Sequence, residues 1–251
     1  MYDRTIRAAA LQLLDDGHSL SSVATELGVS RAAIREWRDR GIEPVVRRRR
    51  PCWVCADDPL EAEASYAALL GYYLGDGYVS RQRSTYSLRV SCDARYPRVV
   101  EDVQQQVVAV RGPGPVGRVR APGCIVVSAY WNHWPCVFPQ HGPGRKHERR
   151  LVLAEWQRDV LGAHPADFLR GLFHSDGCRV NNWTSSRVGS NTRVYEYARW
   201  QFVNHSAEIR EWCTVALDLL GIPWRRSNWK TISVSRRSGV AALDDLIGQK
   251  L

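Results

Sequence analysis

A nine-residue pattern occurs twice in the chain, a hundred residues apart, and it constrains the fold more than any other feature of the sequence. It reads LLGYYLGDG over residues 69–77 and LRGLFHSDG over residues 169–177. Each copy has the character of an apolar helix that ends at Asp-Gly. Since glycine carries no side chain, Gly71 and Gly171 allow two such helices to pack backbone against backbone.

The two Asp-Gly pairs place a carboxylate at the end of each helix. We predict that Gly77 and Gly177 stop the helices by adopting a positive φ. If the helices pack at their earlier glycines, Asp76 and Asp176 emerge side by side at one end of the pair. Two adjacent carboxylates repel one another unless a cation lies between them, and oxygen ligands of this kind suit Mg²⁺. The alternative is two unrelated helices that each end in an ordinary Asp-Gly turn.

Both copies resemble, in register, the LAGLIDADG motif of homing endonucleases, and the resemblance extends over residues 59–251. It implies that Asp76 and Asp176 are catalytic residues and ligands of Mg²⁺. By the same resemblance, the neighbouring backbone carbonyls of Gly75 and Ser175 assist in holding the metal.

Apolar spacing and turn residues around the motifs predict the same run of elements twice. The first run is a helix over 60–74, strands over 78–81 and 86–92, a helix over 97–110, strands over 116–120 and 124–130, and a short helix over 132–138. After a helix over 148–162, the second run is a helix over 164–175, strands over 178–183 and 195–203, a helix over 207–220, strands over 224–229 and 231–236, and a helix over 239–247. The order αββαββα predicts an α+β fold. The family resemblance implies a pseudo-symmetric monomer of tandem LAGLIDADG repeats, with two four-stranded sheets forming a saddle over DNA.

The start of the chain predicts a small all-α domain. Gly17 ends a first helix, Ser19 caps a second, and Gly28 makes a tight turn before Ser30 caps a third. This order is similar to a helix-turn-helix, whose third helix binds DNA. The exposed face of that helix carries Arg31, Arg35 and Arg38. The alternative is a small helical bundle that binds protein.

We therefore expect four parts in the chain. They are a helix-turn-helix domain over 1–43, a basic linker with a C-x-x-C over 44–58, the first repeat with its loop over 59–147, and the second repeat over 148–251. The linker includes four consecutive arginines over 47–50, which either lie along phosphates or form a solvated segment.

Net charge indicates a polyanionic partner. The 251 residues include 35 basic and 26 acidic side chains, for a net charge of +9, and only three of the basic residues are lysines. Arginine favours phosphate and guanine contacts, although a GC-rich genome would produce the same bias. The longest apolar run, over 66–74, is too short to cross a bilayer, and charged residues interrupt the start of the chain. We expect no membrane contact, reduced cysteines, and a cytoplasmic, nucleoid-associated protein.

The C-x-x-C formed by Cys52 and Cys55 has the spacing of a zinc site, because both thiolates can reach one ion from a single turn. A structural site needs two more ligands. Cys136 and His141 are the candidates we favour, with His147 next. The alternative is unliganded, reduced thiols beside a proline-rich loop.

Outward-facing strand residues are expected to contact the major groove. The strand candidates are Arg89, Arg118, Arg120, Arg199, Gln201, Arg225 and Arg226. Members of the family also place polar residues at strand ends to order solvent around the metals. The nearest candidates for that role are Asn204, His205, Lys230, Arg236 and Arg237.

Two hypotheses for the function follow. The first is a site-specific double-strand DNA endonuclease that hydrolyses phosphodiester bonds with Mg²⁺ held by the two motif aspartates. The second is a DNA-binding transcriptional regulator with a LAGLIDADG-like domain that does not cleave. The first acidic position of the motif is Leu74 in one copy and His174 in the other, but this position varies among family members. Both Asp-Gly acids remain, which favours the enzyme.

Overall fold

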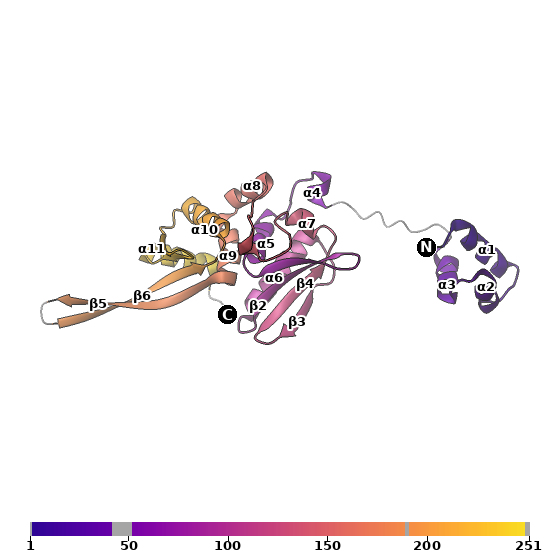
Figure 1. Cartoon of the computed structure of the whole chain (residues 1–251), viewed down its shortest axis with the longest axis horizontal. Coiled ribbons are helices and arrows are strands. Elements are labelled where there is room, and N and C mark those ends of the chain that lie inside the picture. The colour runs from indigo at the N-terminus through magenta and orange to yellow at the C-terminus, as the bar shows by residue number, and fades with distance from the viewer. Residues whose placement is uncertain (1, 42–51, 189–190, 249–251) are drawn as a thin grey trace. The chain divides into compact units, whose positions relative to one another are not determined.

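The computed structural model describes residues 2–41, 52–188 and 191–248, and it divides the chain into two compact units, Met1–Arg50 and Pro51–Leu251 (Figure 1). The arginine run at 47–50 lies outside the described residues. Within the described ranges, no helix is both long enough and apolar enough to cross a membrane.

The first unit is a bundle of three helices, as the sequence predicts. They are α1 (Arg4–Asp15), α2 (Leu20–Leu27) and α3 (Arg31–Arg40). The side chains of Ser19 and Ser30 accept hydrogen bonds from backbone amides in the first turns of α2 and α3, which satisfies donors that a helix start leaves unpaired. Gly28 has a φ of 63°, so the tight turn between these helices uses a conformation that favours glycine. Val23, Ile34 and other small apolar side chains form a core of its own.

The second unit contains the two predicted repeats. The first repeat consists of α5 (Glu63–Leu74), β1 (Gly77–Arg81), β2 (Tyr86–Asp93), α6 (Pro97–Arg111), β3 (Gly117–Ala121), β4 (Cys124–Tyr130) and α7 (Trp134–Val137). The second consists of α9 (Pro165–Asp176), β5 (Gly177–Val188), β6 (Asn191–Val203), α10 (Ala207–Leu219), β7 (Arg225–Asn228), β8 (Thr231–Val234) and α11 (Arg237–Ile247). Two antiparallel sheets result, with strand orders β1-β2-β4-β3 and β5-β6-β8-β7. The matching orders confirm the tandem α+β arrangement.

Three shorter elements lie outside the repeats. Helix α4 (Trp53–Ala56) precedes the first repeat, and a 3₁₀ turn η1 (Lys146–Glu148) and helix α8 (Glu155–Ala163) connect the two. The helix predicted over 148–162 is thus shorter than expected. Residues 149–154 are extended, and Leu151 and Leu153 are buried there at a spacing of two, which is the period of an extended chain.

Helices α5 and α9 cross with their backbones in contact. A Cβ atom built on Gly71 would lie 2.4 Å from the carbonyl oxygen of Phe168, and one built on Gly171 would lie 2.1 Å from that of Ala68. No larger residue fits at either position without moving the helices apart. Every residue of α5 from Tyr66 to Leu74 is buried, because α9 covers one side and the first sheet with α6 covers the rest. This contact between α5 and α9, the seam, is therefore the centre of one core shared by both repeats.

The prediction that Gly77 and Gly177 end the helices by a positive φ is wrong. Gly177 has a φ of −94°, and Gly77 is absent from the positive-φ glycines of the described chain. Both glycines serve close approach instead. A Cβ on Gly77 would lie 2.5 Å from the Cα of Tyr73, and one on Gly177 would lie 2.6 Å from that of Phe173. Each strand thus turns back so tightly onto its own helix that only glycine fits.

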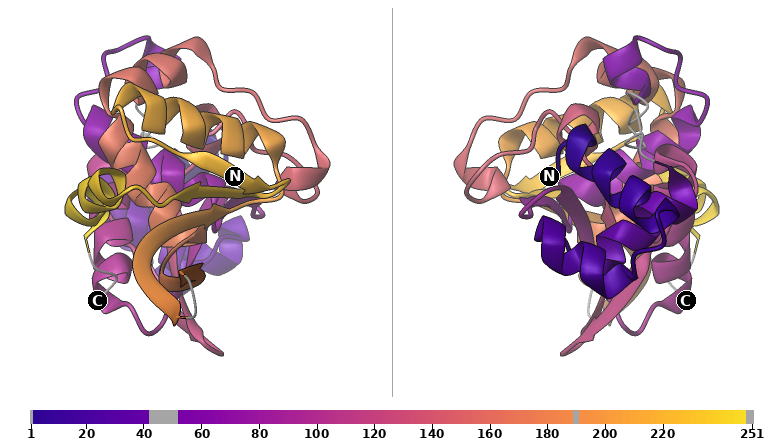
Figure 2. Two further views of the ribbon diagram at one scale, coloured as in Figure 1. Left: turned by 90° about the vertical axis from the view of Figure 1, so that its left-hand side faces the viewer. Right: turned by 90° about the vertical axis from the view of Figure 1, so that its right-hand side faces the viewer.

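The hairpin of the second repeat is longer than predicted. Strands β5 and β6 contain 12 and 13 residues, whereas β1 and β2 contain 5 and 8. Figure 2 shows this hairpin curving away from the helices that cover its base. Side chains such as Trp183, Thr184 and Ser185 are exposed there, so the outer side chains whose burial the structure describes form no buried face. Alternation of apolar and polar residues is therefore missing, and the pattern that reveals a strand in sequence is lost.

Candidate functional site

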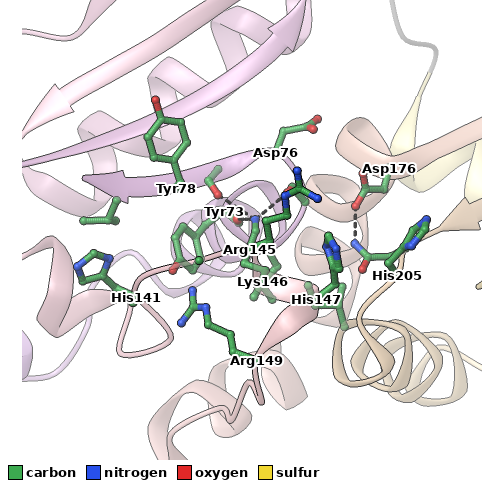
Figure 3. Close-up of a pocket in the computed structure, with 18 of the residues that line it drawn as sticks. Tyr73, Asp76, Tyr78, His141, Arg145, Lys146, His147, Arg149, Asp176 and His205 are labelled. Carbon is green, nitrogen blue, oxygen red and sulfur yellow. Dashed lines mark hydrogen bonds between the residues drawn. The ribbon is translucent and has the colours of Figure 1, made fainter. Parts of the chain in front are cut away.

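A cavity of about 470 Å³ opens where the two motif helices end (Figure 3). Its lining includes Asp76 and Asp176, one from each repeat. The backbone of Gly75 packs against side chains at the end of the other helix, since a Cβ on Gly75 would lie 2.3 Å from the Cβ of Ser175 and 3.4 Å from Asp176 Oδ2. The packing at Gly71 and Gly171 thus brings the two aspartates to one cavity, as the spacing of the motifs predicts.

Asp176 is held in place by a residue of the same repeat. The side-chain amide of Asn204 donates to Asp176 Oδ2 at 2.7 Å, and Asn204 Oδ1 accepts from the backbone amide of Ser206 at 2.8 Å. Because both ends of the Asn204 side chain are engaged, the carboxylate has a fixed orientation. Asn204 is one of the polar residues that the sequence suggests for the strand ends.

Sequence reasoning missed Lys146, a residue of the cavity lining whose side chain contacts the end of the first motif. Its ammonium donates to the backbone carbonyls of Tyr73 at 2.5 Å, Gly75 at 2.7 Å and Gly77 at 2.8 Å (Figure 3). Burial of the ammonium lowers the pKa of Lys146 to about 8, although the charges of Asp176 and Asp76 oppose this shift. A cation therefore already lies among the oxygen atoms of the first motif.

Lys146 was hard to find from sequence because it belongs to neither motif. It lies in η1, in the segment between the repeats, and no periodic pattern marks that segment. The one signal available was rarity, since only three lysines occur among 35 basic residues. A lysine in a chain that otherwise uses arginine indicates a position where a compact ammonium is required.

His147 and His205 line the cavity, and the indole ring of Trp229 packs beside His205. The rings of His147 and His205 lie 5.5 Å apart between centroids, and those of His205 and Trp229 lie 5.2 Å apart. His205 was among the residues suggested to order solvent. The other three, Lys230, Arg236 and Arg237, are not among the residues that line this cavity.

His174, at the variable position of the second motif, makes contacts through both of its ring nitrogens. Its Nε2 lies 3.0 Å from the carbonyl of Ile247, and its Nδ1 lies 2.5 Å from the hydroxyl of Tyr72. The Tyr72 hydroxyl also contacts Asp102, which pairs with Arg170. His174 thus connects the two motif helices to the end of α11.

The register shows which predicted DNA-binding residues share the open faces of the two sheets. Paired residues of antiparallel strands point to the same side. Arg89 pairs with Tyr78 and Ser128, away from the buried Leu88 and Val90. In the second sheet, the residues on the face opposite buried Trp200 and Phe202 are Arg199, Gln201 and Arg225.

Three strand residues differ from the prediction because they lie on the helix-covered side. Arg118 pairs with the buried Val127, and its Nε donates to Gln104 of α6 at 2.7 Å. By the same register, Arg120 pairs with Ile125, which packs against the core. Arg226 likewise pairs with buried Ile232. The strands were located correctly, but their faces were not. Strand β3 is exposed along its whole length, so no buried side chain of β3 marks the face that the helices cover.

In the first unit, the predicted contacts Arg31, Arg35 and Arg38 are exposed on α3. Arg38 also pairs with neighbouring Asp39 at 3.2 Å. The three side chains are thus available along one helix, as a helix-turn-helix requires.

The structure changes the predicted set of zinc ligands. Cys52, Cys55 and Cys136 come together, but the fourth member of the cluster is His133. His141 lines the aspartate cavity and packs edge-on against Tyr86 at 5.8 Å. The sequence reading overlooked that His133 and Cys136 have the same spacing as Cys52 and Cys55.

Residues 1–45 match the family model described as a homeodomain-like domain. No curated protein shows significant similarity in sequence. Among solved structures, the N-terminal LAGLIDADG domain of DUF199/WhiA is similar, at a TM-score of 0.45 and 14% identity over 76% of this chain and 84% of that one.

Two further similar structures are those of named nucleases. I-DmoI in complex with DNA and Ca gives a TM-score of 0.46 and 13% identity over 74% of this chain and 91% of that chain. The LAGLIDADG meganuclease I-AabMI bound to uncleaved DNA gives 0.45 and 12% over 72% and 82%. The family of these structures is the one that the two sequence motifs resemble.

Proposed function

We propose that the chain is a site-specific double-strand DNA endonuclease that holds Mg²⁺ through Asp76 and Asp176. The observation that carries the proposal is the convergence of two carboxylates, one from each repeat, on one cavity with a buried ammonium beside them. A purely structural helix end has no need for paired acids at such a position. Because both halves belong to one chain, we propose that it acts as a monomer.

Several features support DNA as the substrate. The chain has a net charge of +9, and the open faces of the two sheets carry basic and polar side chains. Arg89 and Arg199 place guanidinium groups on these faces. Such groups are suited to phosphate oxygens or base edges. The homeodomain-like unit would add a second surface for binding.

The donors present fit Mg²⁺. Asp76 and Asp176 supply carboxylate oxygen atoms, which are the ligand type that this ion prefers, whereas the carbonyl of Gly75 already accepts a hydrogen bond from Lys146. Bound there, Mg²⁺ would lower the pKa of water and neutralise charge on the phosphoryl group. Asn204 donates to one oxygen of Asp176 and so orients the carboxylate that would hold the metal. Lys146 holds the carbonyls of the first motif and adds positive charge where the phosphate would lie.

A second candidate is a regulator that binds DNA with the same surfaces and does not cleave it. The separate helix-turn-helix unit favours this reading, because it would supply DNA binding that does not depend on the aspartates. The two proposals share a partner and differ only in the chemistry.

Incubation of the purified chain with a library of genomic fragments and Mg²⁺ distinguishes the two candidates. We expect defined double-strand breaks that EDTA abolishes. Asp76→Asn and Asp176→Asn should each abolish cleavage and leave binding intact, since they remove a metal-binding charge at nearly constant shape. Asp159→Asn, on the exposed side of α8, is the matched control and should cut normally. Footprints without breaks in the unaltered protein would establish the regulator instead.

A further inference from the structure

Four side chains with metal-binding atoms form a cluster at the start of the second unit. The sulfur atoms of Cys52, Cys55 and Cys136 and a ring nitrogen of His133 all lie within 4.8 Å of one another. Cys55 is central, with its Sγ 3.4 Å from the Sγ atoms of both Cys52 and Cys136. His133 Nδ1 lies 3.5 Å from Cys55 Sγ and 3.8 Å from Cys136 Sγ.

These separations are those of ligands around one ion. A tetrahedral zinc with bonds of about 2.3 Å to sulfur places its ligand atoms roughly 3.5 to 3.8 Å apart. A disulfide would require sulfur atoms about 2 Å apart. The cluster therefore has the size of a metal site.

The backbone presents the four ligands in two equivalent pairs. Cys52 is the N-cap of α4 and Cys55 is the third residue of that helix. His133 is the N-cap of α7 and Cys136 is its third residue. Each pair thus uses one turn of a four-residue helix to direct two ligands to the same point. Repetition of this geometry in two segments, 81 residues apart, is not expected of thiols that merely fill a core.

We propose that Cys52, Cys55, His133 and Cys136 bind one Zn²⁺ in a structural site. Three thiolates with one imidazole suit Zn²⁺ and exclude Mg²⁺, which requires oxygen ligands. With four protein ligands the coordination is complete, and no position remains open for water or substrate. The site is also separate from the aspartate cavity, since none of its ligands lines that cavity.

The zinc fixes α4 to the body of the second unit. A four-residue helix has too few hydrogen bonds to persist alone, so its place depends on its contacts. Trp53 of α4 packs edge-on against Trp156 at 4.9 Å and Tyr66 at 5.7 Å, and the metal adds direct bonds from α4 to α7. Cys52 is the second residue of this unit. The ion therefore determines the point at which the linker from the first unit joins the second.

Metal analysis of the full chain tests the site. The protein is expressed with zinc in the medium, purified with a reductant, and dialysed before elemental analysis. We expect one zinc per chain. Replacement by Co²⁺ should give the intense visible absorption of a tetrahedral thiolate site. Removal of zinc with a chelator should lower the Tm of the second unit.

Matched variants identify the ligands. Cys55→Ser and His133→Asn should lose zinc, whereas Cys178→Ser and His141→Asn should keep it, because those residues lie outside the cluster. Zinc retained by His133→Asn but lost from His141→Asn would overturn the assignment of the fourth ligand. Absence of zinc from the unaltered chain, iron in its place, or a Cys52–Cys55 disulfide under reducing conditions would overturn the site, whether or not any variant folds.

Discussion

At the cavity where the motif helices end, one lysine lies close to two aspartates of opposite charge. Asp76 and Asp176 line one cavity, and the negative charges of both stabilise the charged form of the Lys146 ammonium. The three carbonyls that Lys146 contacts belong to residues 73, 75 and 77, so this one side chain also fixes the backbone that carries Asp76. Lys146 is therefore expected to influence both the position and the reactivity of the first motif.

Replacement of Lys146 by methionine tests this expectation, because it keeps the length of the side chain and removes the charge. We expect cleavage to fall by roughly a hundredfold, since a positioned charge of this kind contributes about 10²-fold or more to a reaction. DNA affinity should change little. Single-turnover cleavage and gel-shift titration measure the two effects separately. Unchanged cleavage by a folded Lys146→Met variant would remove this residue from the mechanism.

At the scale of elements, the crossing of α5 and α9 organises the second unit. Backbone contact at Gly71 and Gly171 allows both helix ends to reach the same cavity. A side chain at either position would separate the helices and with them the two carboxylates. Only glycine fits at these two positions, because the crossing that brings the two carboxylates together leaves no space for a side chain.

Gly71→Ala should therefore destabilise the second unit by about 3 kcal/mol, the upper part of the range for overpacking a core. The nearest built contact, at 2.4 Å, is to a backbone oxygen that cannot rotate away. Gly162→Ala is the matched control, because Gly162 lies in α8 with no atom within 4 Å of its built Cβ. That change should stabilise by about 0.5 to 1 kcal/mol. Denaturant unfolding of the two variants measures the difference, and equal effects would contradict the close crossing.

The two faces of each sheet give a second prediction at this scale. Arg199 lies on the open face, whereas Arg118 lies on the helix-covered side and binds Gln104. Arg199→Ala should weaken DNA binding and reduce the slope of log K against log salt by about one contact. Arg118→Ala removes the same charge and should leave both quantities nearly unchanged. Equal losses would mean that charge alone, without regard to face, governs binding.

Much of this arrangement could be predicted from the sequence. The strict spacing of Gly71 and Asp76 against Gly171 and Asp176 identified the seam, because helix packing and helix ends depend on local residue types. Residues that reach a site from irregular segments could not be predicted in this way. Lys146 comes from a connection between the repeats, where no periodicity relates sequence position to location in space. His133 was missed for a different reason, since it lies at the start of the predicted short helix and its spacing to Cys136 was not used. Part of the β5–β6 hairpin was missed for a related reason, since outer side chains such as Trp183, Thr184 and Ser185 are exposed and give no alternation of buried and exposed residues.

At the scale of the whole molecule, the chain has two units with separate cores. All residues that line the aspartate cavity belong to the second unit, so we expect that binding and the proposed cleavage can be tested separately. The proposed zinc fixes the beginning of the second unit, at the point where the chain arrives from the first.

Deletion of residues 1–50 should therefore reduce DNA affinity, by roughly tenfold at physiological salt, and should lower the salt dependence of binding. The position of the breaks should not change, because both aspartates and both sheets remain. Affinity measurements and sequencing of the cleaved ends test the two parts of this prediction. Loss of all cleavage by a folded second unit would show that the three helices take part in forming the site.

The unequal hairpins have a consequence for the nucleic acid itself. At about 3.3 Å per residue, the 12 residues of β5 extend roughly 40 Å, more than twice the reach of the 5 residues of β1. Two arms of different length, joined by a nearly symmetric seam, would cover stretches of different length on either side of the scissile bonds. We therefore predict that a target that engages both arms fully is not a palindrome and that the protein binds it in one orientation.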